Sequence, residues 1–260
     1  MVVAADEKGD RGRQSIMQKT VKRWLIAATV LVLIGLAGLV VLLAANSWDI
    51  TKLDTAAFET NTYDLDEAFD KIFVDTDTAD VVIMQSQSNA CKVVCRETEN
   101  VKHTVTVRDG TLTIRTNDER EWYEHIGLSF GSVKITVYLP QKDYEALCIT
   151  TTTGDVKVSD ISFGEMEIEV TTGDVILEHV LTERIMSIRL TTGDVQLDSC
   201  DAGEIFIKTS TGDVWGRLLS EKIFTAKSST GDVRVPKTST GGKCEIRTST
   251  GDIQVEIAKD

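Results

Sequence analysis

One short motif carries most of the side chains in this sequence that could act together chemically. The string Thr/Ser-Thr-Gly-Asp-Val/Ile recurs between residues 150 and 253. Its glycines are spaced by 19, 20, 19, 19 and 20 residues: Gly154, Gly173, Gly193, Gly212, Gly231 and Gly251. One aspartate follows each glycine: Asp155, Asp174, Asp194, Asp213, Asp232 and Asp252. Repetition at this period is typical of a solenoid, in which equivalent residues of successive coils stack into columns.

The aspartate column has two interpretations. Carboxylates stacked roughly 5 Å apart repel by about 1 kcal/mol in water, and calcium, which prefers oxygen ligands, would relieve that repulsion. However, the nine-residue calcium-binding β-roll repeat is far richer in Gly and Asp. A compensating basic column also stands four residues before the glycines: Arg189, Lys208, Lys227 and Arg247. We therefore interpret the aspartates as corner residues that bond to backbone amides, with calcium as the alternative, and we predict no cofactor.

The residues around each motif predict the elements that position it. Glycine takes positive φ without a Cβ clash, which suits a tight corner, and Thr or Ser hydroxyls can bond the backbone or the next coil. Apolar residues lie seven, five and three positions before the glycine and two and four after it, as in Met186, Ile188, Leu190, Val195 and Leu197. This period of 2 places them on one interior face. We predict an all-β, parallel β-solenoid (β-helix-like) of 19–20-residue coils over 150–260.

The region from residue 71 to 149 is expected to be β structure that begins the solenoid. Thr78-Ala79-Asp80-Val81 fits the register of the repeat, and Asp109-Gly110 between two alternating runs predicts a hairpin. Residues 116–130 are expected to be irregular.

The cysteines number five: Cys91, Cys95, Cys148, Cys200 and Cys244. An odd number in a chain of this length argues against a disulfide scaffold. Cys91 and Cys95 form a lone CxxxC, with no second pair and no nearby histidine, and in a strand their Cα atoms would lie roughly 13 Å apart. We predict free or structural cysteines and no metal site.

No motif predicts catalysis. The sequence lacks a nucleophile elbow, a Walker loop, a GxGxxG and a zinc signature, and His103, His125 and His179 are far apart. The acids recur once per coil, which indicates architecture. We therefore predict no catalytic and no cofactor-binding residues, and a protein that is not an enzyme. Trp215, on an outward phase, is a candidate for a contact surface.

An apolar segment predicts a membrane anchor. Residues 24–45 carry no charge, and as a helix they would span about 33 Å, enough for a hydrocarbon core of about 30 Å. Basic residues precede this segment, so residues 1–23 are expected to be a cytoplasmic tail, 46–70 an acidic stalk, and everything after residue 46 extracytoplasmic. A cleaved signal peptide is the alternative, but the apolar run is longer than usual.

The formal net charge of −13 argues against a nucleic-acid partner, because phosphate binding needs clustered Lys and Arg. Three stretches carry a family resemblance: KIFVDTDTADVVIM, then DGTLTIRT followed by VKITVYLP, then the Thr/Ser-Thr-Gly-Asp repeats. Over residues 65–258 the chain resembles the bacterial putative-adhesin family, a domain of unknown function.

The resemblance implies a bacterial envelope protein with one membrane anchor, a β-solenoid and no known catalytic residues. The expected function is an adhesin-like interaction or scaffold module with a protein or glycan partner at the cell surface. The alternatives are an accessory component of an envelope-stress response and a polysaccharide-active β-helix enzyme.

Overall fold

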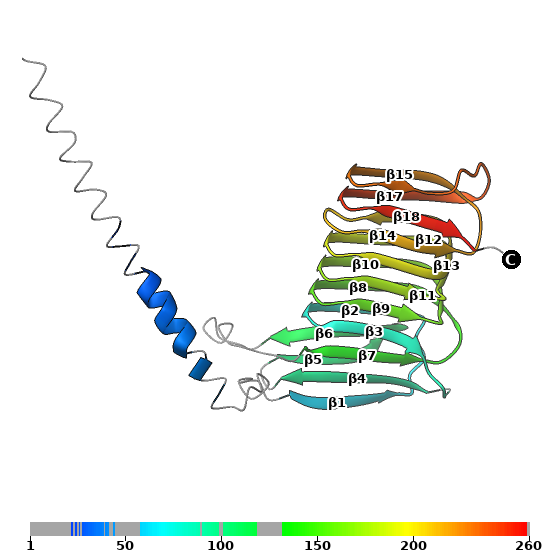
Figure 1. Cartoon of the computed structure of the whole chain (residues 1–260). Helices are drawn as coiled ribbons and strands as arrows, with labels where there is room; N and C mark the ends of the chain where they lie inside the picture. The colour runs from blue at the N-terminus through cyan, green and yellow to red at the C-terminus, as the bar shows by residue number, and fades with distance from the viewer. Residues whose placement is uncertain are drawn as a thin grey trace, which may run out of the picture. The chain divides into compact units, whose positions relative to one another are not determined.

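The computed structural model describes residues 22, 24, 26, 28–38, 40–41, 44, 58–88, 90–98, 101–118 and 132–258. The chain divides into two units, Met1–Thr55 and Ala56–Asp260. In the first unit residues 28–38 are helical and their large apolar side chains are exposed (Figure 1). In the part of the chain that is described, no helix is both long and apolar enough to cross a membrane. Residues 1–21 of the expected cytoplasmic tail lie outside the described residues.

All the regular secondary structure described in the second unit is β-strand. They are β1 (Phe58–Leu65), β2 (Lys71–Thr78), β3 (Asp80–Gln85), β4 (Cys91–Thr98), β5 (Val101–Arg108), β6 (Thr111–Asp118), β7 (Lys134–Leu139), β8 (Asp143–Thr153), β9 (Val156–Ser159), β10 (Ser162–Thr172), β11 (Val175–Glu178), β12 (Leu181–Thr192), β13 (Val195–Lys208), β14 (Val214–Leu218), β15 (Lys222–Thr230), β16 (Val233–Arg234), β17 (Gly242–Thr250) and β18 (Ile253–Ile257).

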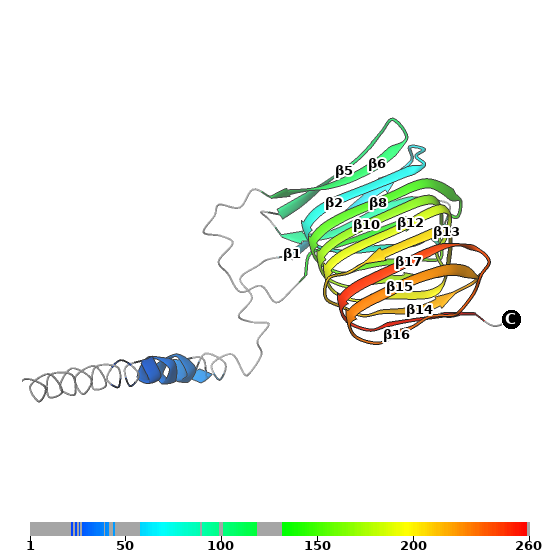
Figure 2. The ribbon, with the colours of Figure 1, turned by 90° about the horizontal axis from the view of Figure 1, so that it is seen from above.

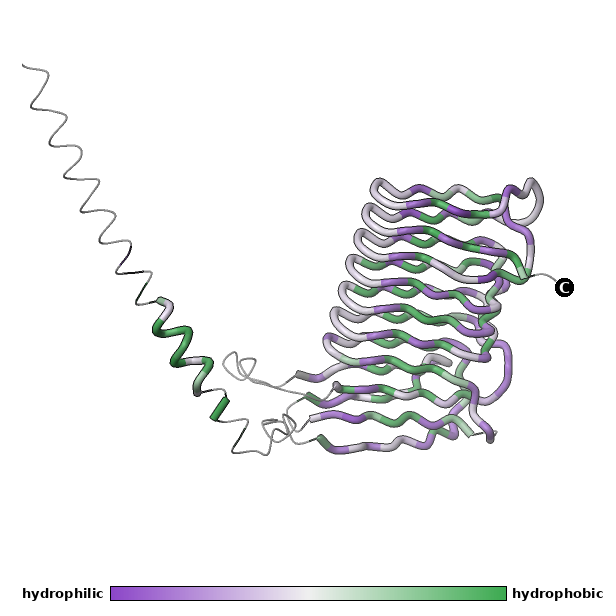
Figure 3. Tube along the Cα trace, viewed as in Figure 1, coloured by the Kyte–Doolittle hydropathy of each residue, from purple (hydrophilic) through white to green (hydrophobic). Residues whose placement is uncertain are grey.

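The predicted solenoid is confirmed. Each coil supplies one strand before the glycine corner and one after it, and these form two opposite walls (Figures 1 and 2). Neighbouring coils pair in parallel and in register. One inward column therefore runs through the first wall: Val74, Ile149, Ile168, Ile188, Ile207 and Ile246. All six are at most 2% exposed, and Figure 3 shows the alternating hydropathy along the strands that produces this core.

The order of the coils in space differs from their order in the chain. Stacking is sequential as far as the Gly212 coil, but β13 and β14 then pair with β17 and β18, and β15 and β16 lie outside these. The prediction that the last coils stack in chain order is therefore wrong. The Gly251 coil brings Ile246 and Ile253, which are buried between two neighbours. The Gly231 coil brings a two-residue strand followed by Pro236, features that suit an edge.

The opposite end of the solenoid changes strand direction. β6 and β7 extend the two walls in parallel beside β2 and β3, but β5 then pairs antiparallel with β6, and β4 antiparallel with β7. The predicted hairpin is confirmed, with φ of 50° at Asp109 and 72° at Gly110. β1 pairs with β4, so part of the expected 46–70 stalk is a strand, because Tyr63 and Leu65 pack on the core. Residues 119–130 of the expected irregular segment lie outside the described residues.

Candidate functional site

The aspartate column is a hydrogen-bonded ladder. In every coil but the last in space, Oδ1 accepts the backbone N–H of the aspartate in the adjacent coil, as from Asp174 to Asp155 at 2.9 Å and from Asp213 to Asp194 at 2.7 Å. The ladder starts at Asp80 and follows the order in space, so Asp252 donates to Asp213, and Asp232 to Asp252. These bonds support the corner interpretation, although the acceptor belongs to the neighbouring coil and not to an Asx turn within one coil.

The corner glycines are required for two reasons. Gly173 has a φ of 144°, a region that L side chains rarely adopt. A Cβ added to Gly173 would also lie 2.1 Å from the carbonyl oxygen of Gly154 in the adjacent coil. The threonine hydroxyls reinforce the corners: Thr209 Oγ1 donates to the Gly193 carbonyl at 3.2 Å, and Thr248 Oγ1 to the Gly212 carbonyl at 3.0 Å. The motif is therefore architectural.

The basic column lies on the outer surface of the first wall and not beside the aspartates. Arg189 Nη1 contacts Glu167 Oε1 at 2.6 Å and Glu169 Oε1 at 2.9 Å. These hydrogen bonds raise the pKa of the Arg189 guanidinium. Arg247 pairs with Glu245 at 2.6 Å. Arg189 thus pairs with glutamates of the neighbouring coil. The sequence did not predict these partners.

A groove of about 710 Å³ lies on this outer surface, and we call it the first-wall groove. Its centre is lined by the outward side chains of Ile185, Ser187 and Phe206, from β12 and β13. The Ile185 side chain is exposed, with 39% of its surface open. Lys243 Nζ lies 4.9 Å from the centre of the Phe206 ring, so a cation already occupies one face of that ring.

Charged side chains flank the first-wall groove on two sides. On the side of β10 they are Glu165 and Glu167, which pair with Arg184 and Arg189. On the side of β13 and β17 they are Lys208, Arg247 and Glu245, of which Arg247 and Glu245 pair with each other. Beside the acidic side, Cys148 has a raised pKa, first because of burial and then because of Glu167 and Glu169. At neutral pH Cys148 is therefore a neutral thiol. The groove combines apolar residues of β12 and β13 with charged, largely ion-paired margins.

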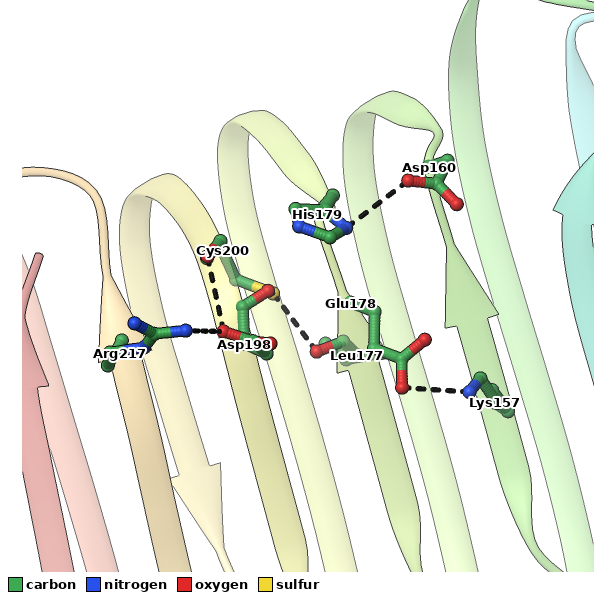
Figure 4. A network of polar contacts seen from close by, with 9 residues as sticks. Lys157, Asp160, Leu177, Glu178, His179, Asp198, Cys200 and Arg217 are labelled. Carbon is green, nitrogen blue, oxygen red and sulfur yellow. Dashed lines mark hydrogen bonds and ion pairs between the residues drawn. The ribbon is translucent and has the colours of Figure 1, made fainter.

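The second wall presents a more polar surface, part of which is drawn in Figure 4. Its coils are joined by Lys157 with Glu178 at 2.8 Å and by Arg217 with Asp198 at 2.6 Å. The hydrogen bond from Arg217 lowers the pKa of Asp198. Trp215 is 38% exposed on this wall and lines a hollow of about 420 Å³. The outward position expected for Trp215 is confirmed.

His179 and the cysteines of the repeat lie where their sequence phase places them. His179 is an exposed corner residue with a φ of 53°, and its Nδ1 lies 3.2 Å from Asp160 Oδ1 (Figure 4). Cys200 and Cys244 are fully buried, and burial raises their pKa to about 11 and about 12. Their thiols are therefore unreactive core groups. His125 lies outside the described residues.

A buried polar cluster at the antiparallel end was missed from the sequence. Cys95 and Glu97 from β4 meet His103 from β5, with one donor atom of each within 4.8 Å of the others. Glu97 Oε2 accepts the backbone N–H and the ring Nδ1–H of His103, both at 2.8 Å, and Oε1 accepts the Asn61 amide at 2.6 Å. The hairpin from β4 to β5 brings these residues together, and Cys91 is not among them.

This N, O and S donor set is the only one among the described residues in which three such side chains cluster closely enough to hold a metal, and borderline ions such as zinc prefer these donors. Burial, followed by the charge of Glu97, raises the pKa of Cys95 to about 12, so the thiol is protonated. Because three hydrogen bonds already satisfy Glu97, we assign the cluster a structural role.

Comparison with known protein families identifies the family that has this architecture. Residues 69–260 match the Toastrack DUF4097 family. The chain belongs to that family. The match spans the Toastrack solenoid from the loop before β2 to the C-terminus, and it supports the adhesin-like resemblance found in the sequence. A search of curated proteins found no match.

Solved structures resemble the Toastrack domain only distantly. A "putative cell adhesion protein" from Clostridium sporogenes is 12% identical, with 78% of this chain and 100% of that chain covered and a TM-score of 0.49. A "putative adhesin" from Bacteroides fragilis is 15% identical, with 78% and 97% covered and a TM-score of 0.40. A "Putative lipid binding protein" from Parabacteroides distasonis is 12% identical, with 77% and 97% covered and a TM-score of 0.30.

Proposed function

We propose that this Toastrack protein is a non-enzymatic interaction module of the bacterial cell envelope, which binds a surface partner through the first-wall groove. The groove carries the proposal. It has an exposed Ile185 beside a half-buried Phe206 on the outer surface of the sheet, between charged margins. Most other conspicuous polar groups of the solenoid serve its architecture, as the aspartate ladder shows.

The groove favours a protein segment over a glycan. Sugars stack on open aromatic faces, whereas one face of the Phe206 ring is occupied by Lys243. A branched aliphatic side chain such as Ile185 packs well against apolar side chains of a peptide. Glu165 and Glu167 lie on one side of the groove and Lys208 on the other. These charges would orient a partner segment that carries basic side chains at one end and acidic side chains at the other.

A membrane anchor completes the proposal. Residues 24–45 have the length and apolarity of a membrane span, and the basic residues before them favour a cytoplasmic N-terminus with the Toastrack domain outside. The test is fractionation of cells producing the full chain or a chain lacking residues 24–45. Only the full chain should remain in the membrane after carbonate extraction, and its Toastrack domain should be cleaved by protease added to intact spheroplasts. Retention of the deleted chain in the membrane would contradict the anchor.

The binding test compares matched isoleucines on the two walls. Fluorescent full-length protein in detergent-free nanodiscs is added to intact bacteria of the producing strain. Ile185→Asp should weaken binding at least roughly tenfold, because a charge replaces apolar contact at the groove centre. Ile176→Asp places the same change on the second wall and should have little effect. Equal binding of all three proteins would contradict the proposal, and loss of binding after deglycosylation but not protease treatment would indicate a glycan partner.

A further inference from the structure

The last coil in space leaves part of the core uncovered. β15 pairs only with β17, and β16 only with β18, so both outermost strands have a free edge among the described residues. Val233 is 41% exposed, whereas Ile253, at the same phase of the neighbouring coil, is 0% exposed. Phe224 and Ala226 are partly buried, whereas Cys244 and Ile246 beside them are fully buried. An edge of this kind can accept another strand.

We infer that the free edge of β15 pairs antiparallel with β15 of a second copy of this chain, about a two-fold axis at Thr225. This inference concerns a surface other than the first-wall groove and goes beyond the proposed function. In this register Phe224 lies directly opposite Ala226 of the other copy, once on each side of the axis. A large side chain therefore meets a small one twice, on the inward face where the core is open.

The charges of β15 fit the same register. Glu221 directly precedes β15, and its carboxylate accepts the Thr240 hydroxyl within its own chain. It would lie diagonally across from Lys227 of the other copy, at a Cβ separation of roughly 7–8 Å that long side chains bridge. Lys222 points inward, and its charge is already compensated by Asp201 at 2.5 Å within its own chain. Ile223, which is 48% exposed, lies opposite the aliphatic stem of Lys227. Strand pairing thus covers apolar surface and joins opposite charges.

The edge at the other end is unsuited to pairing with itself. β1 carries Glu59 and Asp64, and among its charged residues there is no cation. Two antiparallel copies of β1 could therefore form no ion pair between their own residues, so charge does not favour this contact. β15 is therefore the edge that favours an isologous contact. In the resulting dimer the strands β1, through which each chain enters its solenoid, lie at opposite ends of a doubled rod.

The register can be tested by a disulfide on the two-fold axis. Thr225 is exposed, and two copies of residue 225 would lie directly opposite, within the Cα separation that a disulfide allows. Full-length Thr225→Cys protein in detergent should form a covalent dimer on mild oxidation. Gln254→Cys, exposed on β18 away from the edge, is the control and should not. No Thr225→Cys dimer above the control level would overturn the inference.

A charge exchange tests the same contact without a new thiol. The mass of the full-length protein is measured by light scattering across a concentration series. Lys227→Glu and Glu221→Lys should each weaken dimerisation roughly tenfold, because two symmetric attractions become repulsions. The double variant should restore the dimer, which separates lost charge pairing from a folding defect. A monomer at all concentrations, or open-ended growth indicating β15 against β1, would overturn the inference. Neither result would affect the Ile185→Asp test.

Discussion

The two ends of this solenoid finish one continuous hydrophobic core in different ways. At the antiparallel end, β4 and β5 run antiparallel to the wall strands beside them, β1 pairs antiparallel with β4, and a largely buried network around Glu97 joins the three strands. At the parallel end, β15 and β16 simply stop the stack, and Phe224 and Val233 are left partly open. The antiparallel end thus departs from the parallel register of the coils, whereas the parallel end keeps it and leaves inward apolar side chains open.

The largest expected effect lies in the buried network of the antiparallel end. Glu97→Leu would leave the His103 amide and ring and the Asn61 amide without their acceptor, so the free energy of unfolding should fall by about 3–5 kcal/mol. The measurement is urea denaturation followed by circular dichroism. Glu245→Leu removes a partly exposed acid of the first wall, whose ion pairs with Lys243 and Arg247 lie at the surface, and should have a much smaller effect. Similar losses in both variants would show that the network does not hold the end together.

The next effect compares one inward position in a middle coil and in the last coil. Ile205 and Phe224 both lie seven residues before a corner glycine, but Ile205 is fully buried. Ile205→Ala should cost about 2–5 kcal/mol. Phe224→Ala should cost less than half as much, because its side chain is already partly in water. Both losses are measured by thermal unfolding at a micromolar protein concentration at which light scattering finds a monomer. A larger loss at Phe224 would mean that the parallel end is covered.

A smaller effect separates the middle of the aspartate ladder from its last member, Asp232. Asp194→Ala removes the acceptor of the Asp213 amide and should cost about 1 kcal/mol. Asp232→Ala, in the last coil, removes no acceptor of a neighbouring coil's amide among the described residues and should cost less. Millimolar calcium should leave the melting temperature unchanged. A calcium-dependent rise that is lost in Asp194→Asn with Asp213→Asn would instead identify the column as a calcium site.

The smallest difference is kinetic and concerns two equally buried thiols. Burial is the main cause that raises the pKa of both Cys95 and Cys244 to about 12, so at pH 8 only roughly one native thiol in ten thousand is a thiolate. Labelling therefore requires local opening. Cys244 lies one strand from the parallel end and should react with a disulfide reagent before Cys95. The reverse order, read by mass spectrometry of peptides, would place the weaker end at β4.

The solenoid could be predicted from the sequence because its signals are local and repeated. The phase of Ile188 and Ile207, the glycine corners and the Asp109-Gly110 turn each follow from spacing alone. The order of the last two coils could not be predicted, since both coils satisfy the same register. The two coils differ in how well their inward side chains tolerate exposure at the end of the stack. Ala226 and Pro236 in the Gly231 coil are only a weak signal that this coil forms the edge.

The candidate sites were less predictable because they depend on contacts between coils. Cys95 and His103 are eight positions apart and meet only because the β4–β5 hairpin folds them inward beside Glu97. Ile185 and Phe206 come from different coils, and only the parallel register brings them into one groove. The basic column was visible in the sequence, but the glutamate partners of Arg189 lie one coil away.

The most direct test of an asymmetric solenoid is hydrogen exchange of the full-length protein at low and high concentration. At low concentration the amides of β15 should exchange faster than those of β17 and β4, because β15 has one free edge. At high concentration β15 alone should become protected, as its edge pairs with a second copy. Exchange of β15 that is slow at low concentration, or that does not change with concentration, would contradict an open parallel end.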